Sequence, residues 1–375
     1  MFSEKKLQSL LSERSSEGLL RSLRNIPETH IDFSSNDYLG FSKKGILKKT
    51  LKQISKEHNS KKTGSGGSRL LAGNSLLAEE IEQEIAAFHN AESALIFNSG
   101  YDANLGFFSA VPQKNDLIFY DELVHASIRD GMRLSNAHSY KFSHNDLYDL
   151  KNKISLQNTS ERSVFIVVES VYSMDGDFAP LNELADYCEK NGFALVVDEA
   201  HATGLFGKEG RGLCEQAAIE SKCFARMYTY GKAMGAHGAA IAGSKLLHDY
   251  LVNYCRPFIF STSLPQESLL AIKAAYRLSK EEQERKKLFK NIAQFKKKFR
   301  KFKGLLPSDS PIQAIVIPGN DAVQKISDTL FLSGFDVRAV KSPTVKQGYE
   351  RLRICLHSYN TTKEINSLFL AISQI

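Results

Sequence analysis

Short, nearly continuous apolar runs recur through the middle of this chain, and they constrain its fold more than any other feature. Each run is about as long as a strand, and most are separated by stretches that are compatible with a helix. Strands that are apolar on both faces are typical of a parallel sheet covered by helices on each side. The runs are 94–97, 117–120, 164–168, 193–197, 227–230 and 239–242. The sequence therefore predicts an α/β fold with a mostly parallel central sheet.

The C-terminal part has a different pattern. Residues 313–317, 335–340 and 351–356 read as strands, residues 321–334 read as a helix, and Thr361-Thr362-Lys363-Glu364 has the pattern of a capping box. We therefore expect three parts: an N-terminal helical segment and arm at 1–45, a large domain at 46–272, and a small α+β domain at 273–375.

The formal net charge of +7 is concentrated in one segment. Residues 273–303 contain 13 Lys and Arg against 3 Glu, whereas the rest of the chain holds 36 basic and 39 acidic residues. Within that segment Leu288, Ile292, Phe295, Phe299 and Phe302 follow helical spacing. The favoured interpretation is one amphipathic helix with an apolar stripe that packs and lysines that are solvated. A surface for a polyanion or for an acidic acyl carrier protein stays open as the alternative.

Cysteine usage and hydropathy indicate the compartment. The five cysteines form no Cys-x-x-Cys pair, which predicts reduced thiols and no zinc cluster. The first 24 residues lack the apolar core of a signal peptide, and no stretch reaches membrane-spanning length. We expect a cytoplasmic protein that binds no metal.

The residues that end the predicted strands are the first candidates for a site, because ligands of α/β sheets bind at the carboxyl ends of strands. Asp198 ends one strand and is followed by His201. Gly100 lies between a strand and a helix, where free backbone N–H groups suit a phosphate. Lys232 follows a strand between small residues, and a lysine held away from water is readily available for a Schiff base.

A glycine-rich segment, Gly64-Ser65-Gly66-Gly67-Ser68-Arg69, matches neither the Walker loop nor the dinucleotide-binding fingerprint. It reads either as a flexible connection or as a mobile loop at a ligand mouth with Arg69 for an anion.

One ligand would satisfy the strand-end candidates together. Pyridoxal 5'-phosphate (PLP) has a phosphate for the turn at Gly100, a ring nitrogen for Asp198 and an aldehyde for Lys232. Taken singly, each of these residues also has an ordinary structural explanation, such as a cap, a turn or a surface lysine.

The ordered motifs of the chain resemble those of the α-oxoamine synthases, which are fold-type I PLP enzymes, over nearly its whole length. The matching segments are Asp32–Gly40, Gly64–Arg69, Ser99–Tyr101, His125–Ser127, Ser173–Asp177, Asp198–Gly204, Gly207–Gly212, Gly231–Lys232 and Phe260–Pro265. The resemblance implies a mostly parallel large-domain sheet between helices, a smaller α+β C-terminal domain, and acyl transfer from a thioester to an amino acid.

The resemblance also implies a role for each matching residue. Lys232 holds the cofactor and acts as the base, Asp198 pairs with the ring nitrogen, His201 bonds the ring oxygen and His125 stacks on the ring. The other expected cofactor contacts are Gly100, Tyr101, Ser173 and Thr229, together with Ser261 and Thr262, which reach the cofactor of a partner subunit in a homodimer. The expected substrate contacts are Arg353 for the amino acid carboxylate, Thr344, Arg21, Asn36 and His125.

Two positions depart from the family pattern. Ala78 stands where the family usually has a histidine, and the stretch 25–31 is shorter than usual. Both concern acyl recognition rather than the cofactor. The alternatives that remain are a relative that uses glycine, serine or another acyl length, a C–C lyase of the threonine type, a catalytically inactive partner subunit, and a nucleic-acid-binding protein that uses the basic helix.

Overall fold

The computed structural model describes residues 3–58 and 63–374, and the chain divides into two compact units. The larger unit contains residues 39–173 and 177–285. The smaller unit contains the residues up to Tyr38, residues 174–176 and the residues from Lys286 onward. This division differs from the expected boundaries at 45 and 272. The arm joins the C-terminal part because its strand β1 (Ile31–Asp32) pairs with β10 (Phe335–Asp336).

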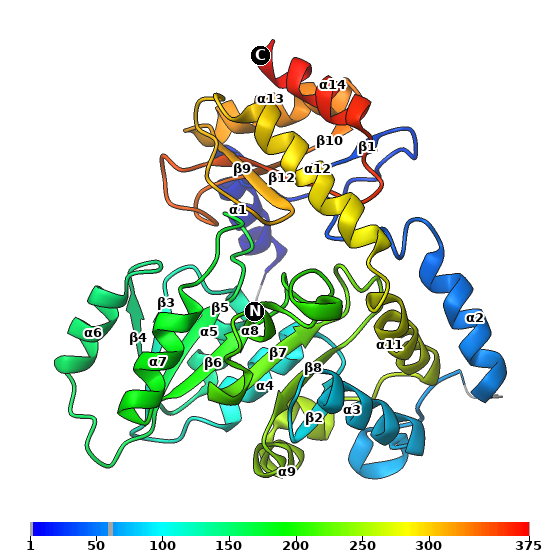
Figure 1. Cartoon of the computed structure of the whole chain (residues 1–375). Helices are drawn as coiled ribbons and strands as arrows, with labels where there is room; N and C mark the ends of the chain where they lie inside the picture. The colour runs from blue at the N-terminus through cyan, green and yellow to red at the C-terminus, as the bar shows by residue number, and fades with distance from the viewer. Residues whose placement is uncertain (1–2, 59–62, 375) are drawn as a thin grey trace. The chain divides into compact units, whose positions relative to one another are not determined.

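A seven-stranded sheet forms the centre of the larger unit (Figure 1), in the order β2-β8-β7-β6-β5-β3-β4. Its strands are β2 (Ser93–Phe97), β3 (Leu117–Asp121), β4 (His138–Phe142), β5 (Val164–Glu169), β6 (Ala194–Asp198), β7 (Cys223–Thr229) and β8 (Ala239–Gly243). Strands β3 to β7 are parallel, and β8 runs antiparallel to both of its neighbours. The predicted α/β fold and its mostly parallel sheet are confirmed.

Helices cover both faces of this sheet. They are α2 (Ile46–His58), α3 (Leu76–Phe88), α4 (Gly100–Ala110), α5 (Ala126–Leu134), α6 (Leu147–Ser155), α7 (Leu181–Asn191), α8 (Leu213–Gln216), α9 (Lys245–Tyr254), α10 (Arg256–Phe260) and α11 (Gln266–Ser279). One apolar cluster joins α4, α5, α9 and α10 to one face through Phe107, Ile128 and Phe258. Helix α7 lies on the opposite side from α4 (Figure 1) and packs against β6.

The smaller unit is built on a three-stranded antiparallel sheet in the order β11-β12-β9. Its elements are α1 (Glu4–Ser16), α12 (Gln283–Phe299), β9 (Ile312–Val316), α13 (Asn320–Leu332), β11 (Arg338–Val340), β12 (Arg351–Cys355) and α14 (Thr362–Ser373), besides β1 and β10. The expected capping box opens α14, because Thr361 and Glu364 bond each other's backbone N–H groups. The strand expected at 335–340 is divided into β10 and β11.

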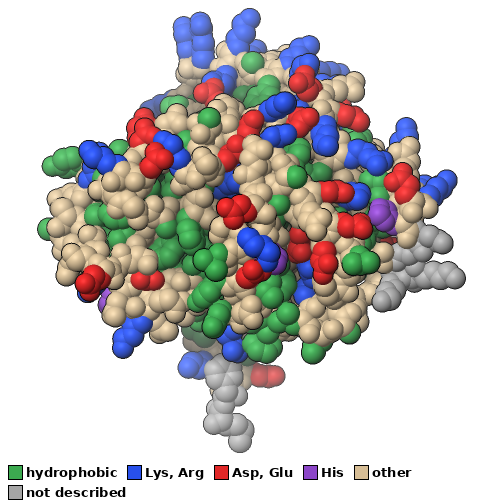
Figure 2. All heavy atoms as spheres, turned by 60° about the horizontal axis from the view of Figure 1, so that its bottom comes forward, with side chains coloured by type: hydrophobic (Ala, Val, Ile, Leu, Met, Phe, Trp, Pro, Cys, Tyr) green, Lys and Arg blue, Asp and Glu red, His purple; other side chains and the backbone are tan. Residues whose placement is uncertain are grey.

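The basic segment forms two helices, not one. Helix α11 ends at Ser279 and α12 begins at Gln283, with Leu288, Ile292, Phe295 and Phe299 of the stripe buried on α12. Two of its lysines have local partners, since Lys296 pairs with Asp309 and Lys298 lies over the Phe369 ring. On the face drawn in Figure 2, basic and acidic side chains are interspersed.

Three further features bear on the predicted compartment and metal content. All five cysteines are free thiols. In the described ranges no helix is long and apolar enough to cross a membrane. The described residues also contain no group of three or more His, Cys, Asp or Glu side chains placed to hold a metal.

Candidate active site

Carboxylates end three neighbouring strands of the larger unit, at the edge where ligands of such sheets bind. Asp121 ends β3, Glu169 ends β5 and Asp198 ends β6. Glu169 and Asp198 are direct neighbours in the β5–β6 register. The prediction of a strand-end site at Asp198 thus coincides with a concentration of buried acids.

Both carboxylate oxygens of Asp198 are anchored. The backbone N–H of Ala200 donates to Oδ1 at 2.8 Å, and the Asn104 side-chain amide donates to Oδ2 at 2.7 Å. Asp198 is only 4% exposed. Two hydrogen bonds to the ionised form keep a buried carboxylate oriented, so Asp198 presents a fixed group at the sheet edge.

His125 is the N-cap of α5. The residue that is expected to stack on the cofactor therefore also has a structural role. Its Nδ1 accepts from the Ser127 backbone N–H at 3.2 Å and lies 2.8 Å from Ser127 Oγ. Burial lowers the pKa of His125, and the charge of Lys232 lowers it further, while the Asp198 charge opposes this shift. The imidazole is therefore neutral near pH 7.

Gly100 starts α4 in a place that only glycine can fill. A Cβ added there would lie 2.5 Å from Thr229 Cγ2. Ser99 caps the helix by accepting from the Asp102 N–H. Tyr101 is 44% exposed, its hydroxyl bonds Asp130, and its ring lies edge-on to His125 at 6.5 Å. The helix start therefore offers backbone N–H groups next to Thr229.

Lys232 lies in a tight bend after β7. The Gly235 N–H donates to the Lys232 carbonyl at 2.9 Å, and the Ala236 N–H donates to the Tyr230 carbonyl at 2.8 Å. Lys232 is half-buried, and its charge acts on His125 and on Glu169. The larger unit thus brings Lys232, Asp198 and His125 into one neighbourhood. His201 and Ser173 are both buried in the same unit.

Glu169 is a strand-end acid to which the sequence reasoning gives no specific role. Burial raises the pKa of Glu169 to about 8, and the nearby Asp198 charge adds to this shift. Glu169 is therefore mostly protonated at neutral pH. The proximity of Glu169 to Asp198 is visible only in the pairing of β5 with β6, because 28 intervening residues separate the two acids in the sequence.

We expect Glu169→Gln to flatten the pH dependence of stability. Because the folded protein holds this proton from about pH 4.5 to about pH 8 and the unfolded chain does not, unfolding free energy should fall as pH rises through that range. Glutamine resembles the protonated acid and removes this decline. Urea unfolding of both proteins at pH 6 and pH 9 measures the effect, and equal losses in the two proteins would contradict it.

His144 is clamped between two carboxylates close to the same sheet edge. Its Nδ1 lies 3.0 Å from Asp121 and its Nε2 lies 2.7 Å from Asp177. Burial alone would lower the pKa of His144, but the hydrogen bonds to Asp121 and Asp177 raise it to about 10. His144 therefore stays charged and neutralises the acids beside it.

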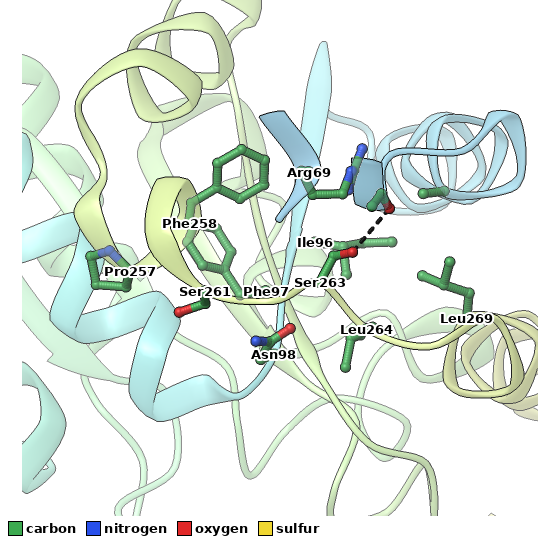
Figure 3. Close-up of a pocket in the computed structure, with 12 residues that line it drawn as sticks. Arg69, Ile96, Phe97, Asn98, Pro257, Phe258, Ser261, Ser263, Leu264 and Leu269 are labelled. Atoms are coloured by element: carbon green, nitrogen blue, oxygen red, sulfur yellow. Dashed lines mark hydrogen bonds between the residues drawn. The ribbon is translucent and has the colours of Figure 1, made fainter. Parts of the chain in front are cut away.

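Ser261 and Thr262 follow α10 near the pocket shown in Figure 3, which Ser261 lines. The Asn98 amide donates to the Thr262 carbonyl at 2.8 Å, and Ser263 bonds the Gly73 carbonyl at 2.9 Å. Ala78 lines the same pocket. Within the larger unit, Ser261 and Thr262 are thus fixed beside the strand end that leads to Gly100.

Arg69 does not present a free guanidinium for an anion. Both of its terminal nitrogens bond the Glu82 carboxylate, at 2.8 and 2.9 Å, and Nε bonds Asn74. A bidentate pair of this kind satisfies the guanidinium internally. Arg69, the last residue of the glycine-rich segment, begins a π-helical turn that extends to Gly73.

All the expected substrate-binding residues except His125 lie in the smaller unit. Arg353 is buried on β12, where its guanidinium bonds Asn36 Oδ1 at 3.0 Å and Cys355 Sγ at 2.8 Å. Thr344 follows β11, and its N–H bonds the Lys341 carbonyl. Arg21 is exposed in the arm after Gly18, whose carbonyl accepts from Lys341. Arg353 and Asn36 are therefore in contact, and Arg21 is not part of that pair.

The chain belongs to the aminotransferase class I and II family, which it matches over residues 28–372. The 8-amino-7-oxononanoate synthase of Emericella nidulans is 41% identical to it, over 98% of this chain and 94% of that protein. A solved 8-amino-7-oxononanoate synthase of Francisella tularensis is 31% identical, with a TM-score of 0.78 over 93% of this chain and 98% of that one. A serine palmitoyltransferase of S. paucimobilis, solved with a PLP–myriocin aldimine, is 25% identical, with a TM-score of 0.89 over 98% and 96% of the two chains. The fold-type I resemblance is thus confirmed.

Proposed function

We propose that this protein condenses L-alanine with a pimeloyl thioester in a PLP-dependent reaction. The products are 8-amino-7-oxononanoate, CO₂ and the free thiol of the carrier, and the pathway served is biotin biosynthesis. The observation that carries the proposal is the cluster of Asp198, His125 and Lys232 at one sheet edge. Support from relatives comes from the 8-amino-7-oxononanoate synthase of Emericella nidulans, which is 41% identical over 98% of this chain.

The residues present fit PLP. The glycine at position 100 lets the Thr229 side chain approach the start of α4 closely, because an added Cβ would lie 2.5 Å from Thr229 Cγ2. Backbone N–H groups at a helix start suit a phosphate, and Thr229 would add a hydroxyl. Asp198 would hold the ring nitrogen, while His201, Tyr101 and Ser173 would complete the contacts around the ring.

When bound, PLP supplies a ring that accepts electrons from the α-carbon of the amino acid. The Asp198 anion keeps a proton on a nitrogen placed beside it, because an adjacent negative charge favours the protonated form. The Lys232 amine would hold the cofactor before the amino acid binds and would then accept the proton that the α-carbon loses. His125 covers one face of the site as a neutral ring. Arg353 would bind the substrate carboxylate in place of its present partners Asn36 and Cys355.

A homodimer in the cytoplasm is part of this proposal. Ser261 and Thr262 would contact the cofactor phosphate of a second copy. Several large apolar side chains of the larger unit are exposed, among them Leu71, Leu246, Tyr254 and Phe260. One of them, Phe260, directly precedes Ser261 in the sequence, so an apolar side chain is exposed next to the residues expected to contact the second copy. Thr344 and Arg21 would contribute to substrate binding.

A substrate panel tests the function. The purified holoenzyme receives L-alanine, glycine or L-serine with thioesters of pimeloyl, acetyl and palmitoyl chains, and mass spectrometry identifies the product. We expect 8-amino-7-oxononanoate from L-alanine and the pimeloyl ester. A preference for L-serine with the palmitoyl ester would instead support the second candidate, which the fold similarity to serine palmitoyltransferase favours. A protein that binds no PLP would indicate an inactive partner subunit.

As a further part of this proposal, the acyl carrier is a carrier protein that docks on α12. Lys290, Lys297 and Lys301 are exposed on or just after this helix, whereas Lys296 and Lys298 have local partners. Reversing the charge of Lys290, Lys297 and Lys301 to Glu should raise KM for a carrier-bound pimeloyl group by about tenfold, since several exposed attractions become repulsions. KM for pimeloyl-CoA should change little.

Equal effects on both esters would count against docking on α12. Nucleic acid binding that survives moderate salt would instead favour a polyanion partner.

A further inference from the structure

Asn104 is a buried residue between two expected cofactor residues that are distant in sequence. It lies on α4, one helical turn after Gly100, and is 2% exposed. Its amide nitrogen donates to Asp198 Oδ2 at 2.7 Å and to Ser127 Oγ at 3.1 Å. Its Oδ1 has no hydrogen-bond partner among the described residues. A flipped amide would direct that oxygen at the Asp198 carboxylate, so the donor orientation is the only one that the charges allow.

The orientation of Asn104 determines the orientation of Ser127. Because Ser127 Oγ accepts a hydrogen from Asn104, its own hydrogen is available for His125 Nδ1, 2.8 Å away. The same Nδ1 also accepts from the Ser127 backbone N–H. A ring nitrogen that accepts two hydrogen bonds carries no proton. The neutral ring must then carry its hydrogen on Nε2.

We infer that Asn104 and Ser127 are positioning residues that join Asp198 to His125 and hold His125 as the neutral Nε2–H tautomer. The inference rests on the proposed roles of Asp198 and His125 at the cofactor. The bridge runs from Asp198 on β6 through Asn104 on α4 to Ser127 and His125 at the start of α5. It fixes the group at the ring nitrogen and the group on the ring face relative to each other.

The other charges around His125 do not produce this tautomer. Asp198 and Asp130 favour the charged ring, whereas burial, Lys232 and Arg129 favour the neutral one. These influences set how much of the ring is protonated, but they do not choose between the two neutral forms. The choice comes from the two donors at Nδ1, and both belong to Ser127.

The test reads the tautomer directly in the apoprotein labelled with ¹⁵N-histidine, with His125→Gln to assign the signal. We expect the Nε2–H form in the natural protein and in Ser127→Thr, which keeps the hydroxyl. In Ser127→Ala we expect a measurable share of the Nδ1–H form and a titration midpoint that moves upward, because the neutral ring loses a donor. A natural protein in the Nδ1–H form, or an unchanged spectrum in Ser127→Ala, would overturn the inference.

The holoenzyme provides a second readout. Asn104→Leu should lower kcat at least about tenfold, with KM for the amino acid changed less than threefold, since orientation and not substrate binding is lost. Ser109→Ala on the same helix, whose hydroxyl bonds only the Gly106 carbonyl, is the matched control for folding. An unchanged kcat in Asn104→Leu would contradict the positioning role. If the tautomer responds as expected but no alanine is condensed, the bridge stands and the proposed function fails.

Discussion

Replacing Lys232 with alanine should nearly abolish turnover while the protein remains folded. We expect kcat to fall by at least roughly 100- to 10,000-fold, the usual contribution of a positioned acid–base group. The loss of the attachment point for the cofactor adds to this. Product formation followed by mass spectrometry measures the rate. Borohydride treatment followed by peptide mapping shows whether the cofactor is still fixed to the chain.

Lys245→Ala is the control for this change. Lys245 is an exposed lysine of the same unit that pairs with Asp249 one turn along α9. Its removal should leave both turnover and cofactor attachment unaffected. If Lys232→Ala still retains the cofactor after borohydride, another amine performs the role and the assignment of Lys232 is wrong.

Asp198→Asn should have the second largest effect. The change keeps the size of the side chain but removes the negative charge and places an amide in contact with the Asn104 donor. We expect kcat/KM to fall by about 100- to 1,000-fold, which is typical for the loss of one preorganised electrostatic group. Cofactor affinity should fall as well, and equilibrium dialysis against PLP measures it.

Asp186→Asn provides the comparison for Asp198. Asp186 is an exposed acid on α7 that pairs with Lys222, so its charge lies outside the sheet-edge cluster. It should leave kcat/KM and PLP affinity close to those of the natural protein. If Asp198→Asn lowered the thermal midpoint but not kcat/KM, Asp198 would be a structural residue and not a cofactor ligand.

The sequence predicts the strands of the large sheet because they are apolar on both faces. The runs at 117–120, 164–168 and 239–242 each fall within an observed strand. Strand β4 escapes this reasoning, since it lies at the sheet edge and its residues His138 and Ser139 are exposed. An edge strand of mixed polarity carries no continuous apolar pattern.

The candidate site shows the same difference between features of the local sequence and features that depend on tertiary contacts. Gly100, Asp198 and Lys232 stand out because each lies at the end of a strand or three residues beyond it, and the local sequence contains that information. The Glu82 partner of Arg69 is 13 residues away, and the pKa of Glu169 is raised by burial and by Asp198 on the neighbouring strand, so neither feature is visible in the local sequence. Contacts that depend on tertiary structure leave no local pattern in the sequence. The roles of the site residues stay predictions that the variants above test.

The division of the chain also has a consequence for how the protein is made. The smaller unit takes its first residues from the N-terminus and its last from the C-terminus, and Ile31 pairs with Phe335 across most of the chain. During synthesis, the arm therefore leaves the ribosome long before its partner strand exists. The larger unit, between residues 39 and 285, can begin to fold meanwhile. The arm that carries Asn36 must wait for β12 and Arg353, so the expected carboxylate-binding pair is among the last parts of the molecule to form.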